Sequence, residues 1–270
     1  MKMLLYIFFF ILCQLTVNAQ MKPVEYHTEI IYKYTFQGDS TSTASSKSVM
    51  MQLMVGDKES HYQSVAKAKS DSTLALDDFK STFYSYGGIN PNNYLIVKKD
   101  DIIQTFEPVT GVGLTGNNEL SYYEQTKKDL KWEVHTDTIH KGTFVAQRAT
   151  TTWGGREWTA WFTMEVPISE GPYKFSGLPG LIVAMSDQDK YFNFDLISVR
   201  LVKRTSLSFE KIRPSLSLLK TSHAAFYAER KKLRGNMIEY GALTGSKFNE
   251  EAKKSILQQT KADNNFIERY

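Results

Sequence analysis

The chain has 270 residues, of which 41% are hydrophobic and 23% are charged, and its net charge is +4. This composition is typical of a folding chain and excludes general disorder. The near balance of 33 basic and 29 acidic residues argues against a dedicated nucleic-acid-binding protein. The length suits one large domain or two small ones, and we expect a single β-rich domain over residues 20–270.

The N-terminus has the pattern of a cleaved export signal, predicted over residues 1–19. Lys2 supplies a positive charge, Met3–Leu12 is an apolar run, and Val17–Ala19 offers small residues for cleavage. The run is too short to span a bilayer, which needs about 20 residues. A lipid-modified cysteine normally follows a small residue, whereas Cys13 follows a leucine. We therefore predict an exported chain, periplasmic, outer-membrane-associated or secreted, with no membrane span after cleavage.

No catalytic or metal-binding pattern is visible. Cys13 is the only cysteine and would leave with the export signal, so the rest of the chain lacks thiolate chemistry. His135 and Asp137 would share one face of a strand, but His140 would lie on the other. The sequence contains neither a G-x-S-x-G motif nor a glycine-rich phosphate loop. We predict no metal ion, no cofactor and no catalytic residue, and we lean towards a protein that is not an enzyme.

Runs of aromatic and β-branched residues, separated by turns, fill most of the chain up to residue 202. The predicted strands are at 24–36, 49–55, 60–65, 94–98, 102–106, 122–123, 132–138, 144–152, 156–164, 181–185 and 191–202. Short turns join neighbouring strands, so we expect antiparallel pairing, because parallel pairing needs longer crossovers.

Helical patterns are concentrated near the C-terminus. A weak pattern covers 66–83, whereas Ser215–Tyr240 and Glu250–Gln259 read as helices. We predict a mainly β fold with C-terminal α structure over about 214–260, in which a single curved antiparallel sheet or half-barrel is covered by the C-terminal helices. In outline this resembles the half-barrel carriers that ferry lipids or lipoproteins across the periplasm, which is an analogy of fold alone.

The segment Arg156–Asp187 is rich in turns and aromatic residues. Gly171-Pro172 and Gly177–Gly180 force two tight changes of direction between apolar stretches. The segment reads either as a buried turn that leads into a core strand, or as a rigid apolar rim that grips a ligand or a partner. Trp158 and Trp161 would lie on opposite faces of one strand, and tryptophan is common both in cores and at binding sites.

A family resemblance becomes specific at Gly177–Ile182, which reads GLPGLI. The chain is identified by this hexapeptide as a member of the GLPGLI family, secreted proteins widespread in the Bacteroidetes. The resemblance continues through Gly155-Arg156, Ala160–Phe162 and Gly171–Phe175, and it reaches Asn264-Asn265. It carries no established activity, and it implies work in the cell envelope beside outer-membrane transporters.

We therefore predict a non-enzymatic binding or carrier protein for an apolar ligand or an envelope partner such as an outer-membrane transporter. The alternatives are a hydrolase with an unrecognised site and a structural component of the envelope. Arg156 would either pair with Glu157, Glu165 or Asp187, or bind an anionic ligand. The candidate binding residues are Arg156, Trp158, Trp161, Phe175, Gly177, Leu178, Pro179, Gly180, Leu181 and Ile182.

Overall fold

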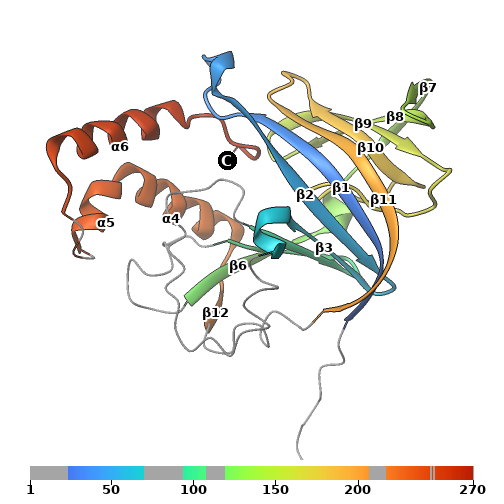
Figure 1. Cartoon of the computed structure of the whole chain (residues 1–270), viewed down its shortest axis with the longest axis horizontal. Helices are drawn as coiled ribbons and strands as arrows, with labels where there is room; N and C mark the ends of the chain where they lie inside the picture. Colours follow the sequence, from blue (N-terminus) through green and yellow to red (C-terminus); the bar gives the residue numbers. More distant parts are fainter. Residues whose placement is uncertain are drawn as a thin grey trace, which may run out of the picture.

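The computed structural model describes residues 24–69, 94–107, 119–206, 217–243, 245 and 247–269. In this part of the chain, 12 strands form one sheet in the order β12-β6-β5-β4-β3-β2-β1-β11-β10-β9-β8-β7 (Figure 1). The strands are β1 Val24–Gln37, β2 Ser46–Gly56, β3 Glu59–Ser64, β4 Leu95–Lys99, β5 Ile102–Phe106, β6 Glu119–Thr126, β7 Glu133–Lys141, β8 Phe144–Trp153, β9 Arg156–Thr163, β10 Leu181–Asp187, β11 Phe192–Ser206 and β12 Ser217–Lys220. The predicted mainly β fold with C-terminal helices is confirmed.

One strand pair departs from the expected antiparallel pattern. β12 pairs with β6 in parallel, with Ser217 opposite Glu119 and Lys220 opposite Tyr122. The strand before β12 in sequence is β11, which five other strands of the sheet separate from β6, so no short turn imposes an antiparallel direction. The expectation of an antiparallel sheet throughout is therefore wrong at this edge.

Two long strands give the sheet its curvature. β1 pairs with β11 along nearly its whole length, with register shifts at Tyr26/Thr28 and Ile31/Tyr32, and such bulges bend and twist a strand pair. β1, β2 and β11 consequently run as long bent ribbons across the molecule (Figure 1). Alternate side chains on the concave side form the hydrophobic core, which includes the fully buried Tyr32 and the stacked rings of Tyr34 and Phe194, whose centroids are 4.5 Å apart.

The helices α4 His223–Gly235, α5 Met237–Leu243 and α6 Glu250–Ala262 lie beside the β6 end of the sheet (Figure 1). The predicted helix over Ser215–Tyr240 was wrong in extent, because Ser217–Lys220 form β12 and the helical part divides into α4 and α5. Ser222 caps α4 by accepting a hydrogen bond from the Ala225 amide at 3.1 Å, and α4 ends at Gly235. In the weak pattern over 66–83, residues 66–69 are helical, and 70–83 lie outside the described residues.

After α6 the chain returns to the sheet. Residues 263–269 leave the helix, run to the concave side of the sheet and end close to the turn between β8 and β9. None of the helices in the described part of the chain is both long and apolar enough to cross a membrane.

Candidate functional site

The segment that carries the predicted binding residues lies largely in the core. Phe175, Leu181 and Ile182 are fully buried, and Leu178 is 1% exposed. Within the hexapeptide only Gly177 and Pro179 are exposed. This burial favours the first of the two alternatives, a buried turn that leads into β10, and a binding role for these residues stays a prediction.

Backbone geometry explains two of the glycines in this turn. Gly177 has a φ of 94°, which is the left-handed region that favours glycine. Gly180 lies so close to the end of β9 that a Cβ atom there would be 2.1 Å from the Thr163 carbonyl oxygen. The Trp132 indole also donates a 2.9 Å hydrogen bond to the Ser176 carbonyl, which fixes the start of the turn.

The two tryptophans of β9 do lie on opposite faces of the strand. Trp158 is 1% exposed, its ring centroid is 4.9 Å from that of Phe175, and its indole donates to the Trp153 carbonyl at 3.0 Å. Trp161 is partly exposed and packs against the margin of the core. Trp158 is therefore a core residue, and Trp161 has surface that a partner can reach.

This difference predicts unequal effects on stability. Trp158→Ala should lower the free energy of unfolding by about 3–5 kcal/mol, because it removes a fully packed aromatic ring. Trp161→Ala should cost about 1–2 kcal/mol, since part of that side chain remains in water. Urea unfolding of both variants measures the difference. Equal losses would contradict the placement of the two rings.

Arg156, the first residue of β9, joins the sheet to the C-terminal segment. Its guanidinium pairs with the Asp187 carboxylate at 2.9 Å, and it also donates to the Asn265 side chain at 2.5 Å and to the Phe266 carbonyl. Of the three acidic residues predicted as partners of Arg156, Asp187 is the one that pairs with it. Gly155-Arg156 and Asn264-Asn265, which lie at opposite ends of the predicted family resemblance, are thus brought together in space.

One charged residue of the C-terminal segment, Glu268, is buried among polar groups. Its Oε1 accepts hydrogen bonds from Lys174 Nζ at 2.5 Å and from the Tyr173 hydroxyl at 2.8 Å. Its Oε2 accepts one from the Tyr227 hydroxyl at 3.1 Å and lies 3.5 Å from His223 Nε2. Both partners of the Lys174–Glu268 ion pair have no exposed side-chain surface. The core therefore contains a fully buried ion pair.

The pKa values of Glu268 and Lys174 depend on the contact between these two residues. Burial by itself would raise the pKa of Glu268, but the Lys174 ammonium and hydrogen bonds from His223, Lys174 and Tyr173 hold that pKa well below its usual range. Burial lowers the pKa of Lys174, although Glu268 opposes this shift. Each charge therefore stabilises the other.

The depressed pKa of Glu268 predicts a dependence of stability on pH. A carboxyl group whose pKa is lower in the folded state than in the unfolded state stabilises the fold above its unfolded pKa, which is about 4.3, and loses this contribution as the pH falls. We expect the free energy of unfolding to decrease as the pH falls from about 5 to about 2, and Glu268→Gln to flatten this slope. Urea unfolding across that range tests it. The exposed Glu251 provides the matched control, and Glu251→Gln should keep the slope of the unchanged protein.

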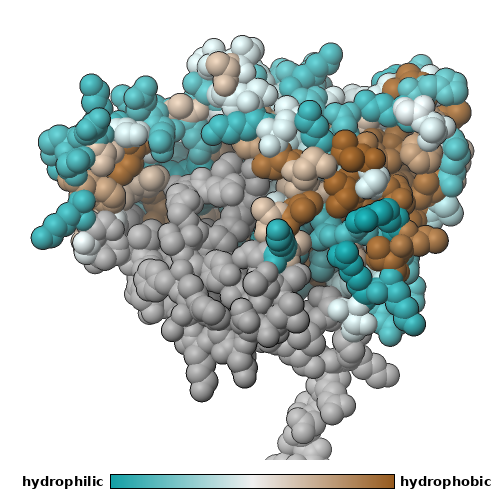
Figure 2. All heavy atoms as spheres, in the orientation of Figure 1, coloured by the Kyte–Doolittle hydropathy of each residue, from teal (hydrophilic) through white to brown (hydrophobic). Residues whose placement is uncertain are grey.

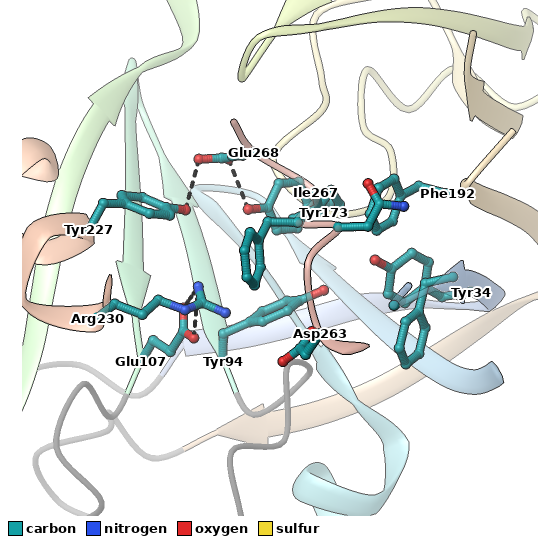
Figure 3. A pocket seen from close by; sticks show the side chains of 14 residues that line it. Tyr34, Tyr94, Glu107, Tyr173, Phe192, Tyr227, Arg230, Asp263, Ile267 and Glu268 are labelled. Carbon is teal, nitrogen blue, oxygen red and sulfur yellow. Dashed lines mark hydrogen bonds and ion pairs between the residues drawn. The ribbon is translucent and has the colours of Figure 1, made fainter. Parts of the chain in front are cut away.

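A small cavity lies next to this cluster (Figure 3). It has a volume of about 40 Å³, which is room for about three water molecules, whereas small-molecule sites usually have roughly 300–1,000 Å³. The buried Tyr94 hydroxyl at its wall has no hydrogen-bond partner among the described residues. Its polar wall also holds the Glu107–Arg230 ion pair, with an N–O distance of 3.1 Å. The cavity is lined by Tyr34, Phe36, Gly38, Tyr94, Glu107, Tyr173, Phe192, Tyr227, Arg230, Asp263, Asn265, Phe266, Ile267 and Glu268.

The second half of β11 is the most exposed apolar part of the sheet. β10 pairs with β11 only at residues 193–195, so within the described chain Leu196–Ser206 pairs with β1 alone. We call this stretch the β11 edge. Leu201 is 88% exposed and Ile197 is 54% exposed. Figure 2 shows hydrophobic side chains interspersed with polar ones over the region where β1, β2 and β11 run side by side.

The β11 edge is also basic. Arg200, Lys203 and Arg204 are exposed, and the stretch contains no acidic residue. Glu29 of β1 is 2% exposed and pairs with both arginines, at 3.3 Å from Arg204. One carboxylate therefore faces two guanidinium groups, which leaves positive charge at this surface.

Sequence reasoning missed Glu268, Lys174, Tyr227 and His223. Isolated glutamate and lysine residues usually lie at the surface, so nothing in the local pattern distinguished them. The available signals were the family resemblance at Gly171–Phe175, which contains Lys174, and at Asn264-Asn265, which ends three residues before Glu268.

His135 and Asp137, the two residues that weakly suggested a metal site, form other contacts. His135 Nε2 lies 2.8 Å from the Thr150 hydroxyl, and Asp137 accepts a hydrogen bond from Arg148 at 2.6 Å. In the described ranges no three histidine, cysteine or acidic residues gather as a metal site.

Comparison with known proteins gives a family match and a distant structural one. Residues 123–184 match a family described as "Protein of unknown function (Porph_ging)", and this span runs from β6 into β10 and includes the GLPGLI hexapeptide. No curated protein matches the chain. Two crystal forms of PNGF-II share 12% sequence identity with it at a TM-score of 0.52, and the matches cover 77% of this chain and 34% and 33% of those chains. The chain thus spans about a third of the length of PNGF-II, and the likeness shows a shared fold alone.

Proposed function

We propose that this chain is an exported, non-enzymatic binding protein of the GLPGLI family that docks on an envelope partner through the β11 edge. The observation that carries the proposal is the contrast between the two sides of the sheet. The concave side is filled by aromatic core residues and by the C-terminal segment, whereas Leu201 is 88% exposed on a strand whose free edge is unpaired within the described chain.

The filled concave side argues against a carrier of a lipid-sized ligand. The cavity of about 40 Å³ is several times smaller than a typical small-molecule site. Its wall also bears the Glu107 and Arg230 charges, which an apolar ligand would have to desolvate. Of the two predicted binding roles, docking on a partner is therefore the better supported.

The chemistry of the β11 edge selects the kind of partner. An unpaired strand edge can accept an extended segment through backbone hydrogen bonds, and pockets for alternate side chains add specificity. Arg200, Lys203 and Arg204 favour an acidic segment and repel a second copy of the same strand. The proposed occupant is an extended acidic segment of an envelope protein, with apolar side chains that cover Ile197 and Leu201.

Site-specific photo-crosslinking in the host cell tests this proposal. A benzoylphenylalanine at Leu201 should form one discrete adduct with an envelope protein, because that side chain lies on the proposed contact surface. The matched control is Leu257, which is 52% exposed on α6 and should form no such adduct. Lys203→Glu should reduce the yield from position 201, and added salt should do the same.

The identity of the adduct decides the outcome. An acidic segment at the crosslinked site of the partner would support the proposal. Equal adducts from positions 201 and 257, or no adduct from position 201, would contradict it.

A further inference from the structure

The C-terminal segment Asp263–Arg269, which we call the strap, is held to the sheet by contacts of its own. It is joined to the rest of the fold through α6, a helix with no buried residue. The strap itself buries Asn265 to 6% and Glu268 to 2% exposure. Its position therefore depends on its own contacts with the sheet and with α4, and not on packing of the preceding helix.

The first half of the strap forms hydrogen bonds with the end of β1 and the turn that follows it. The amides of Asn264 and Asn265 donate to the Gly38 carbonyl at 3.1 and 3.0 Å. The Asn265 side chain donates to the Gln37 carbonyl at 2.8 Å and accepts from Arg156 at 2.5 Å. Both hydrogen-bonding functions of one buried amide are thus satisfied by the sheet, which makes asparagine specific at this position.

The second half of the strap rests on the turn between β8 and β9. The Arg269 amide donates to the Gly154 carbonyl at 2.7 Å. A Cβ atom at Gly154 would lie 2.7 Å from Glu268 Cγ, and one at Gly155 would lie 2.8 Å from the Arg269 carbonyl oxygen. Two glycines therefore provide a surface that a peptide backbone can approach closely.

The loop between β9 and β10 and the helix α4 provide a receptor for one carboxylate. Lys174, Tyr173, Tyr227 and His223 converge on Glu268 from the core and from α4. Figure 3 shows the Glu268 carboxylate between the hydroxyls of Tyr173 and Tyr227. Charge-assisted hydrogen bonds of this kind are stronger than neutral ones and make a carboxylate specific at this point.

From these contacts we propose that the concave side of the sheet is a binding site for an extended peptide with an asparagine followed three residues later by a glutamate. The strap is the peptide bound there in cis. A segment of another protein with the same chemistry would bind in its place when the strap is released. This site is separate from the β11 edge and does not depend on it.

Binding of a labelled peptide to the full chain tests the inference. The peptide has the sequence KADNNFIERY, residues 261–270, and fluorescence anisotropy follows it. The receiving protein is the Asn265→Ala/Glu268→Ala double variant, which weakens the strap and keeps the receptor residues Arg156 and Lys174. We expect saturable binding to this variant and at least tenfold weaker binding to the unchanged chain, because a tethered strap competes at an effective concentration of about 1 mM or more.

A peptide with a single substitution tests whether binding requires the glutamate carboxylate. The same peptide with glutamine in place of the glutamate should bind the double variant at least tenfold less tightly. Equal affinity of the two peptides, or no saturable binding to the folded double variant, would overturn the inference.

Should the double variant not fold, Asn264→Ala replaces it. The Asn264 side chain is exposed and bonds to Ser40 and Asp39 at 2.9 Å, so this variant loosens the start of the strap and leaves Glu268 in place. Peptide binding stronger than that of the unchanged chain supports the inference. Binding equal to that of the unchanged chain overturns it.

Discussion

Replacing Lys174 with methionine should lower the free energy of unfolding by about 3–5 kcal/mol, which is the usual effect of removing one member of a buried ion pair. Methionine keeps much of the volume of the side chain but leaves the Glu268 carboxylate without its cation in a site with no exposed surface. Its hydrogen bonds from Tyr173 and Tyr227 do not neutralise the charge. Equilibrium unfolding in urea measures the loss.

Two control variants separate this effect from a general sensitivity to substitution. Lys253→Met breaks an ion pair with Glu250 on the surface of α6, and its effect should be close to zero. The double variant Lys174→Met/Glu268→Leu removes both charges and should recover most of the lost stability. A loss below about 1 kcal/mol for Lys174→Met would show that the ion pair is not buried as described.

Gly180→Ala should cost at least about 3 kcal/mol or prevent folding, although it adds only one methyl group. That methyl group would lie 2.1 Å from the Thr163 carbonyl oxygen and 2.7 Å from its carbon. These are backbone atoms of β9 next to the Leu181–Thr163 pair, so they cannot move without separating β10 from β9. Thermal unfolding followed by circular dichroism measures the change.

The matched control is Gly235→Ala at the end of α4. Among the described residues, no atom outside the backbone of α4 lies within 4 Å of a Cβ atom added there, and alanine favours a helix over glycine by up to about 1 kcal/mol. This variant should be neutral or slightly more stable. A Gly180→Ala protein as stable as this control would contradict the close packing of the hexapeptide turn.

Much of the sheet follows from local sequence pattern. The strand predicted over 102–106 agrees with β5 Ile102–Phe106, and the one predicted over 24–36 differs from β1 by one residue. Alternation of aromatic or β-branched residues between glycine- and asparagine-rich turns is a local property, so it can be read without knowing the fold.

Pairings between distant segments could not be read in this way. β12 has only four residues and is defined by its parallel contact with β6, and its own sequence, SLLK, fits a helix equally well. Gly235-Asn236 interrupts the helical pattern, which the sequence presents as nearly continuous from 215 to 240.

The candidate sites were predicted in part. The sequence drew attention to Arg156–Ile182, and the structure shows these residues mainly as core, with Arg156 paired to Asp187. Lys174 and Glu268 are 94 positions apart, and their burial depends on the strap returning to the sheet. No periodicity or motif encodes a contact of that kind.

Native mass spectrometry of the protein purified gently from the envelope of its own host tests the central claim most directly. We predict that the chain carries a bound protein partner, and that Leu201→Asp abolishes this complex while the unfolding temperature stays unchanged. A chain that instead retains a lipid or another small molecule, equally in the Leu201→Asp variant, would contradict docking through the β11 edge and restore the carrier alternative.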